Sequence, residues 1–486
     1  MVIFGGTGDL AKRKLFPALF HLYQDQQLAT GFAILSFARS KMTDEEYRHS
    51  IQEAVRTFSE EPFHEKGWDE FSKHLFYLSG GFGEDQSYIL LCEKIHQITV
   101  SNAQMIENVI YYMAVPPQFT SVVVEKLENR NLCKGNFHTK IIVEKPFGRD
   151  YASAVELNQM LRKAFDENQI YRIDHYLGKE PVQNITFFRF ANSIFEQVWN
   201  RSFIDNVQIT VAEDLGIEHR SAFYEGAGVV RDIVQNHILQ LIGLIAMEPP
   251  PGFESESIRD EKGKVFRSIS LMDDPSIDRF TVRGQYGKGR VRGQEVAAYR
   301  EEAGIPPDSK TPTFFAAKLH IENWRWAGVP FYVRTGKRLA KRITEIAIVF
   351  RHPPLKLLGK TTGLLDPNML LWTIQPDEKV ALRFNVKYPY SDDRIYSANM
   401  LLNYRETFKT TRHDPYERLL IDCVKGDLSL FARQDGVEAM WKIVDPIIAR
   451  WENTPSHDFP NYTAGGWGPP EADLLMKRDG RRWITT

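Results

Sequence analysis

The chain has 486 residues, more than one compact core usually serves, so we expect two domains. Lysine plus arginine (61) nearly balance aspartate plus glutamate (63), and the formal charge of -2 argues against nucleic-acid or membrane partners held by bulk charge. The sequence has no apolar run of about 18 residues and no charged leader before its first strand. We therefore expect a soluble, cytoplasmic protein.

The three cysteines, Cys92, Cys133 and Cys423, are far apart in the sequence. Their odd number and the lack of a paired ligand spacing indicate neither a disulfide framework nor a zinc site. We predict reduced thiols and no metal.

The N-terminal segment predicts a nucleotide-binding turn. Val2-Ile3-Phe4 is a short strand-forming run, followed by glycines and then by a helical pattern of leucines. Gly6-x-Gly8-x-x-Ala11 fits the dinucleotide fingerprint, in which small residues let the backbone approach a pyrophosphate. The basic run 12–14 adds positive charge at the same helix start. The alternative is a plain turn.

The second predicted strand, 32–38, ends in Arg39-Ser40. Folds that prefer NAD usually place an acid here for the ribose hydroxyls, and this chain has none. An arginine suits the additional phosphate of NADP, because its planar guanidinium pairs with phosphate and stacks on adenine. The alternative is a surface arginine.

Helical and strand patterns then alternate as far as residue 173, which predicts a doubly wound parallel sheet. The predicted helices are 44–58, 88–98, 117–128 and 151–165, and the predicted strands are 108–115, 138–144 and 169–173. Glu144-Lys145-Pro146-Phe147 follows a strand end, where such sheets bind ligands, so Lys145 is a candidate contact for cofactor and substrate. The Lys-Pro bond can be cis, although trans is the more common state.

The stretch Arg172-Ile173-Asp174-His175-Tyr176-Leu177-Gly178-Lys179-Glu180 brings a carboxylate, an imidazole, a phenol and an ammonium together. On a helix, His175 and Lys179 share a face and can hold one anion, such as a phosphate. The alternative is a solvated helix start with Asp174 as its N-cap.

Beyond this stretch, strands follow one another with few helices between them, which predicts an antiparallel sheet. The predicted strands are 207–211, 314–321, 330–334, 345–350, 369–374 and 380–386, and the predicted helices are 228–247, 415–423 and 436–451. We therefore predict an α/β plus α+β protein. Residues 1–174 form a Rossmann domain with a doubly wound parallel sheet, and residues 175–486 form a domain on a large, mostly antiparallel sheet.

The long helical region 228–247 contains a candidate base. A histidine among apolar residues is more often part of the core than a catalyst, but His237 follows a polar pair. Asp232 lies five residues earlier, roughly 140° around an α-helix. When hydride leaves an alcohol carbon the hydroxyl proton must leave too, and neutral histidine can accept it. A carboxylate behind the histidine would fix its tautomer, and Asp174 and Asp232 are both candidates.

Taken together, these residues resemble the glucose-6-phosphate dehydrogenase family over nearly the whole chain. The resemblance rests on the runs 5–14, 144–148, 172–180, 231–237, 324–337 and 415–419 and on the Gly-Pro tail. The run 172–180 is highly specific to that family, whereas the glycine turn is not.

The resemblance implies a role for each matching residue. The implied catalytic pair is His237, as general base, with Asp174. The implied substrate-binding residues are His175, Tyr176, Lys179, Glu213, Asp232, Lys337, Arg342 and Lys145. The implied cofactor contacts are Gly6, Thr7, Gly8, Asp9, Leu10, Lys14, Arg39 and Lys145.

The activity implied by the resemblance is oxidation of D-glucose 6-phosphate at carbon 1 to 6-phospho-D-glucono-1,5-lactone. NADP is the implied hydride acceptor, with NAD as a secondary cofactor, in the first oxidative step of the pentose phosphate pathway. The implied assembly is a homodimer formed through the large sheet, or a homotetramer. Two alternatives are an NAD(P)-dependent dehydrogenase of an unphosphorylated sugar or polyol, and a nucleotide sensor without turnover.

Overall fold

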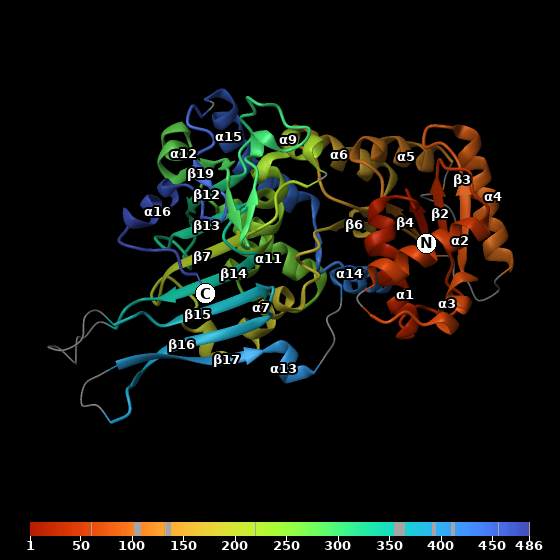
Figure 1. The fold of residues 1–486 in the computed structure, drawn as a ribbon. Coiled ribbons are helices and arrows are strands. Elements are labelled where there is room, and N and C mark those ends of the chain that lie inside the picture. The colour runs from red at the N-terminus through yellow and green to blue at the C-terminus, as the bar shows by residue number, and fades with distance from the viewer. Residues whose placement is uncertain are drawn as a thin grey trace. The chain divides into compact units, whose positions relative to one another are not determined.

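The structure is a computed structural model, and it describes residues 1–59, 61–101, 108–130, 132, 138–218, 220–353, 365–390, 395–409, 414–454 and 456–485. The chain forms two compact units (Figure 1). Unit 1 comprises Met1–Lys179, Pro251–Arg259 and His413–Glu438; unit 2 comprises Glu180–Pro250, Asp260–Arg412 and Ala439–Thr486. The chain therefore returns to unit 1 twice after first leaving it.

Unit 1 is built on a seven-stranded sheet in the order β18-β6-β5-β4-β1-β2-β3. Strands β1 to β6 run parallel, and β18 pairs antiparallel with β6 at one edge. The parallel sheet predicted from the sequence is confirmed. The strands are β1 Val2–Phe4, β2 Ile34–Ala38, β3 Leu75–Ser79, β4 Asn108–Met113, β5 His138–Val143, β6 Ile170–Ile173 and β18 Phe431–Ala432.

Helices cover both faces of the sheet of unit 1. Because successive strand residues point to opposite faces, Ile3 packs into a core with α1, α2, α3 and α14, while Phe4 stacks on Tyr88 of α4. The predicted helix 44–58 has the observed bounds of α2, and Thr43 caps it by accepting from the N–H of Glu46 at 3.2 Å. The helices are η1 Ala11–Leu15, α1 Phe16–Gln24, α2 Asp44–Phe58, α3 Glu65–Ser72, α4 Asp85–Ser101, α5 Pro117–Asn129, α6 Tyr151–Ala164, η2 Glu167–Gln169 and α14 Pro415–Lys425.

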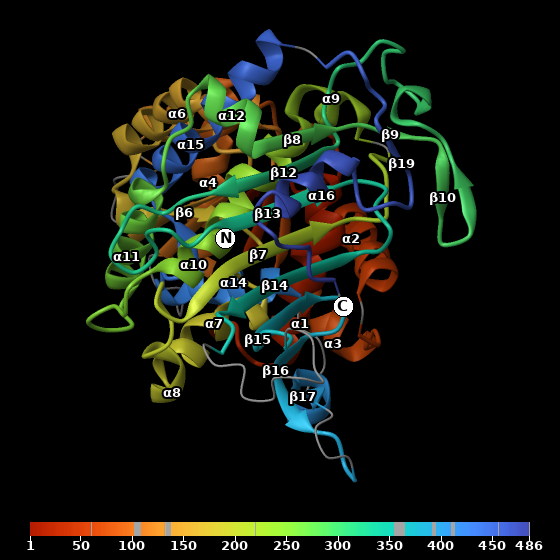
Figure 2. The ribbon, with the colours of Figure 1, turned by 90° about the vertical axis from the view of Figure 1, so that its left-hand side faces the viewer.

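Unit 2 is built on an eight-stranded sheet in the order β17-β16-β15-β14-β7-β13-β12-β8 (Figure 2). Neighbouring strands are antiparallel except β7 and β13, which run parallel, so the mostly antiparallel sheet is also confirmed. The strands are β7 Ile204–Ala212, β8 Thr281–Gly284, β12 Phe314–Leu319, β13 Phe331–Gly336, β14 Ile343–Phe350, β15 Met369–Gln375, β16 Lys379–Lys387 and β17 Ile395–Asn403.

The two faces of the sheet in unit 2 are covered differently. On one face lie α7 and α10, joined where Arg189 donates to the carbonyl of Leu244 at 2.9 Å. On the other face the C-terminal segment binds Gln208 of β7, which accepts from the N–H of Ile484 at 2.8 Å. The remaining elements are α7 Glu180–Phe190, α8 Ser193–Glu196, α9 Ser221–Val229, η3 Val230–Ile238, α10 Leu239–Ala246, α11 Ser255–Ser268, α12 Asp274–Phe280, β9 Tyr286–Gly287, β10 Gly289–Val291, β11 Gln294–Val296, η4 Tyr299–Glu301, α13 Tyr404–Phe408, α15 Gln434–Asn453, β19 Tyr462–Thr463 and α16 Pro470–Lys477.

The helical run Ser221–Ala246 is long and apolar enough to cross a membrane by length and composition alone. The sequence predicts a helix at 228–247 within this run but no uninterrupted apolar stretch of about 18 residues, because charged and polar residues interrupt the apolar ones. Inside the protein 94% of its most apolar window is buried, which is typical of a core helix.

Two of the three cysteines lie in the described residues, and both are free thiols. Cys92 is partly exposed, whereas Cys423 is buried and its burial raises the pKa of its thiol well above the usual value. Cys133 lies outside the described residues.

Candidate active site

The glycine-rich turn of unit 1 lies between β1 and η1. Gly5 has a φ of 83° and donates its N–H to the carbonyl of Phe37 at 2.8 Å. A Cβ on Gly5 would collide with the carbonyl oxygen of Ala114, and one on Gly6 would collide with Ser36. The turn therefore runs tightly against the ends of β2 and β4, and its residues fit a dinucleotide whose pyrophosphate lies against bare backbone.

The basic residues near this turn have different surroundings. Lys14 pairs with Asp414, the N-cap of α14, at 2.7 Å, and Arg13 pairs with Asp9 at 2.6 Å. Arg39 is exposed just beyond the end of β2. Lys14 and Arg39 are therefore both at the surface of unit 1, at the edge where parallel strands end.

The turn after β5 holds Lys145 and a hydrogen-bonded acid. The Lys145–Pro146 peptide is cis, the rarer of the two states considered from the sequence. Tyr112 of β4 donates to the carboxyl of Glu144. Burial raises the pKa of Glu144 to about 7, although hydrogen bonds from Tyr112 and Tyr416 and the charge of Lys145 oppose the shift.

Residues 174–179 form a series of turns, so the prediction that His175 and Lys179 share a helical face is wrong. Asp174 accepts from the N–H of Tyr176 at 3.0 Å, and its carbonyl accepts from Leu177 at 3.0 Å. This side-chain bond competes with helix formation, and helix α7 begins only at Glu180.

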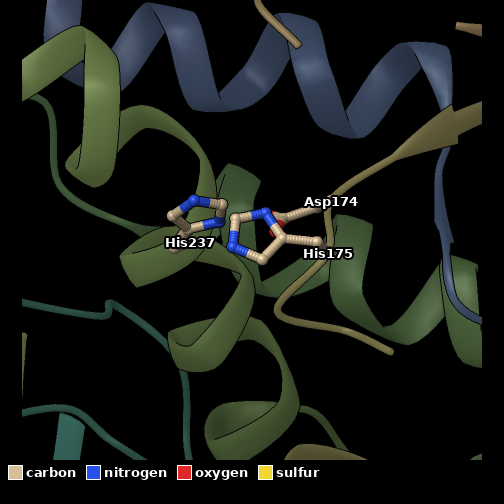
Figure 3. Close-up of side chains that lie close together, drawn as sticks. All are labelled: Asp174, His175 and His237. Carbon is tan, nitrogen blue, oxygen red and sulfur yellow. The ribbon is translucent and has the colours of Figure 1, made fainter. Parts of the chain in front are cut away.

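The side chains of this segment divide into buried and partly exposed ones. Asp174 and Tyr176 are 2% and 6% exposed, while His175 and Lys179 are partly exposed. Figure 3 shows Asp174 and His175 on the segment that follows β6. The ammonium of Lys179 lies 4.2 Å from the ring centroid of Tyr176, and the ring of His175 meets the same ring edge-on at 5.2 Å. Tyr176 thus contacts both His175 and Lys179.

His237 lies in unit 2 on η3, which is π-helical rather than α-helical (Figure 3). Hydrogen bonds in a π-helix join residues five apart, so Asp232 lies about one turn before His237. The sequence analysis placed Asp232 roughly 140° from His237 around an α-helix. In the observed π-helix the two residues lie about one turn apart instead. His237 and Asp232 are 1% and 4% exposed.

A buried lysine joins two acids in unit 2. Glu213 and Lys337 directly follow Ala212 and Gly336, which pair at the ends of the parallel strands β7 and β13. Lys337 forms an ion pair with Glu213 and lies 3.7 Å from Asp232. Because the lysine is 2% exposed, its charge is compensated by these acids, as buried charges require.

Sequence analysis missed several residues around these sites, and one residue that it predicted, Arg342, lies at the surface. Arg342 is exposed on the segment before β14. Tyr224, whose ring centroid is 5.5 Å from the ammonium of Lys337, was not predicted, because a tyrosine in an apolar helix carries no functional signal. Tyr112 and Asp414 were missed because their partners lie far away in the sequence.

The glycine turn on a doubly wound sheet, together with a second unit that holds a buried histidine, two acids and a lysine, defines the class of the protein. It is an oxidoreductase that uses a nicotinamide dinucleotide.

Comparisons with known proteins identify the family. The family model described as glucose-6-phosphate dehydrogenase, NAD binding domain, matches residues 2–184, and the C-terminal domain model matches residues 186–484. A glucose-6-phosphate 1-dehydrogenase of Chlamydia pneumoniae is 43% identical over 99% of this chain and 95% of its own length, and one of Bacillus subtilis is 40% identical over 99% and 97%.

Solved structures agree with this assignment. A glucose-6-phosphate dehydrogenase in complex with its substrate glucose-6-phosphate has a TM-score of 0.89 and 34% identity, covering 100% of this chain and 98% of its own. The glucose-6-phosphate 1-dehydrogenase of Mycobacterium avium has a TM-score of 0.85 and 35% identity, with the same coverage. The chain belongs to the glucose-6-phosphate dehydrogenase family.

Proposed function

We propose that this protein oxidises D-glucose 6-phosphate at carbon 1 to 6-phospho-D-glucono-1,5-lactone, with NADP as the hydride acceptor. The observation that carries the proposal is His237, buried on a π-helical turn with Asp232 one turn before it, in a chain that also has the dinucleotide turn. π-helical turns are frequent at functional sites.

His237, as the general base, accepts the proton of the carbon 1 hydroxyl. When bound, the nicotinamide accepts the hydride. Asp174 is the carboxylate that orients His237 and stabilises its charged form, and its backbone contacts with Tyr176 and Leu177 hold it in place for this role. Glu213 and Asp232 accept hydrogen bonds from sugar hydroxyls, and Lys337 is the cation that lies next to both acids.

The phosphate of the substrate is held by His175, Tyr176 and Lys179. The partly exposed imidazole and ammonium lie against one tyrosine ring, and they supply charge-assisted donors to a dianion. Lys145 contacts the sugar from the cofactor side, and Arg342 is a further, peripheral basic group.

The turn formed by Gly6, Thr7, Gly8, Asp9 and Leu10 would hold the cofactor, beside Lys14. Arg39 selects NADP over NAD by pairing with the additional phosphate. Replacement of Arg39 by alanine is expected to raise the KM for NADP at least about tenfold and to leave the NAD reaction nearly unchanged. An equal loss with both cofactors would contradict this role.

The direct test is nicotinamide reduction by the purified protein with glucose 6-phosphate, with NADP compared with NAD and glucose as the control sugar. Rapid reduction only with the phosphorylated sugar supports the proposal. Equal rates with glucose would indicate a dehydrogenase of unphosphorylated sugars, and cofactor binding without turnover would indicate a nucleotide sensor.

The protein is further proposed to form a cytoplasmic homodimer through the sheet of unit 2. Strand β17 is an edge strand with exposed apolar side chains, including Tyr396, Met400 and Leu401. An edge strand of this kind invites pairing with another chain unless it is covered. A homodimer covers it.

A further inference from the structure

A carboxyl group joins three elements of unit 1 next to Lys145. Glu144 follows the last residue of β5. Tyr112 of β4 donates its hydroxyl to Oε1 of Glu144, and Tyr416, in the first turn of α14, forms a second hydrogen bond with the same carboxyl. The two tyrosines are almost fully buried, at 0% and 8% exposure. The carboxyl therefore fixes the turn that carries Lys145 from two sides.

Two opposing influences set the charge of this carboxyl. Burial and the nearby charge of Asp174 favour the protonated acid, whereas the hydroxyls of Tyr112 and Tyr416 and the ammonium of Lys145 favour the carboxylate. The result is a pKa of about 7, so Glu144 changes charge near neutral pH. The tyrosine hydroxyls remain protonated donors over this range, because burial, together with the charge of Glu144, raises their pKa.

The ionised form of Glu144 has an effect on Lys145 that the protonated form lacks. Glu144 directly precedes Lys145 in the chain, and because the ammonium of Lys145 favours ionisation of Glu144, the carboxylate in turn attracts that ammonium. Asp414, the N-cap of α14, pairs with Lys14 of η1, the helix that follows the glycine turn. One end of α14 thus contacts both η1 and the turn that carries Lys145.

We propose that Glu144 is a positioning residue, whose ionised carboxylate, held by Tyr112 and Tyr416, orients Lys145 for the sugar and the cofactor. This inference rests on the proposed function, because Lys145 has a role only if the sugar and the dinucleotide bind beside it.

The test compares wild-type protein with Glu144→Gln, which keeps the size of the side chain and one acceptor oxygen but cannot ionise. The kcat/KM for glucose 6-phosphate is measured from pH 6 to pH 8. At pH 6, where Glu144 is mostly protonated, the kcat/KM values of the two proteins are expected to differ by less than about threefold. At pH 8, where Glu144 is mostly ionised, the kcat/KM of the wild type is expected to be at least about tenfold higher. The substrate phosphate and the catalytic base also titrate, but they titrate in both proteins and largely cancel in the ratio.

Two tyrosine variants form a matched pair. Tyr112→Phe removes a hydrogen-bond donor to the carboxylate of Glu144, and this loss raises the pKa of Glu144. The increase in kcat/KM that depends on the ionised Glu144 is therefore expected at higher pH. Tyr111→Phe is the control, because Tyr111 is the adjacent, equally buried residue and its hydroxyl donates to the carbonyl of Leu132 at 3.1 Å. A structural disturbance alone would affect both variants without moving the pH dependence.

The proposal would be overturned if the ratio of kcat/KM between wild type and Glu144→Gln were independent of pH. It would also be overturned if Tyr112→Phe and Tyr111→Phe had identical pH profiles of kcat/KM. Binding of glucose 6-phosphate without cofactor, measured calorimetrically at pH 6 and pH 8, separates this proposal from the proposed function. If the wild type binds and oxidises the sugar but Glu144→Gln matches it at both pH values, only the role of Glu144 fails. If the wild type neither binds nor oxidises it, both proposals fail.

Discussion

At the scale of single residues, the sites combine buried charge with partly exposed charge. The acids and the lysine of unit 2 are compensated within the protein, since Lys337 reaches Glu213 and Asp232. His175 and Lys179 of the 174–179 segment are partly exposed. This difference predicts that the buried groups orient the sugar and accept its proton, whereas the partly exposed groups bind the phosphate.

Replacement of His237 by asparagine is expected to lower kcat by about 10²- to 10⁴-fold, because general-base catalysis contributes that much. The KM for both substrates should change little. Steady-state kinetics measures this, and His320→Asn, a partly buried histidine of the same unit, is the control. Wild-type turnover in the His237 variant would exclude it as the base.

Lys179→Met is expected to lower kcat/KM for glucose 6-phosphate roughly 10- to 150-fold, because one charge-assisted hydrogen bond to phosphate is lost. This factor corresponds to a loss of about 1.5–3 kcal/mol of transition-state stabilisation. The slow reaction with glucose should be unaffected. Lys163→Met, at an exposed position on α6, serves as the control. Equal losses with glucose and its phosphate would show that Lys179 does not bind the phosphate.

At the scale of elements, α14 links distant parts of unit 1. Asp414, Tyr416 and Glu417 in its first turn contact Lys14, Glu144 and His21, which lie on three other segments. His21 is buried, and its ring nitrogens contact Glu417 at 2.9 Å and Ser59. The helix therefore contacts η1, which follows the glycine turn, as well as the core.

The His21–Glu417 pair predicts a pH dependence of stability. Burial alone would lower the pKa of His21, but the hydrogen bond to Glu417 and the charge of that residue outweigh it and raise the pKa. The stability from this pair is present below the unfolded pKa of about 6.5 and is lost as the pH rises through the folded value. Urea unfolding of wild type and His21→Gln at pH 5.5 and 8.5 should show the larger difference at pH 5.5. An equal difference at both pH values would exclude a charged pair.

The glycine turn is expected to tolerate no side chain at its first position. Gly5→Ala combines a positive φ with a collision against the carbonyl of Ala114, and it should weaken cofactor binding at least about tenfold. Gly293→Ala is a matched control, because Gly293 has a φ of 80° but open space around it, so only the backbone cost of roughly 1 kcal/mol is expected. Cofactor titration by fluorescence measures both variants.

At the scale of the whole molecule, assembly through β17 is the expected state. Met400→Lys places a charge on the exposed face of this edge strand and is expected to convert the dimer into monomers. Light scattering after gel filtration measures the mass, and Leu474→Lys, at an exposed position on α16, is the control. A dimer that survives the Met400 change would place the interface elsewhere.

Much of the fold could be predicted from local patterns, and the misses have physical causes. Alternating residues identified β7 and β14, and the capping residue Thr43 marks the start of α2. Strand β17 was missed because its apolar residues are exposed on both faces and do not alternate. The π-helical turn at His237 and the hydrogen bond that breaks the helix at Asp174 depend on backbone geometry that residue spacing alone does not specify.

The late return of the chain to unit 1 has a consequence for biosynthesis. Leu419, Leu420 and Cys423 of α14 complete the core that α1, α2 and α3 begin. On the ribosome, at roughly 5–20 residues per second, the N-terminal helices are made many seconds before α14 emerges. A nascent chain stalled within the sheet of unit 2 therefore presents the apolar side of α1 to solvent, and we expect chaperones to bind it.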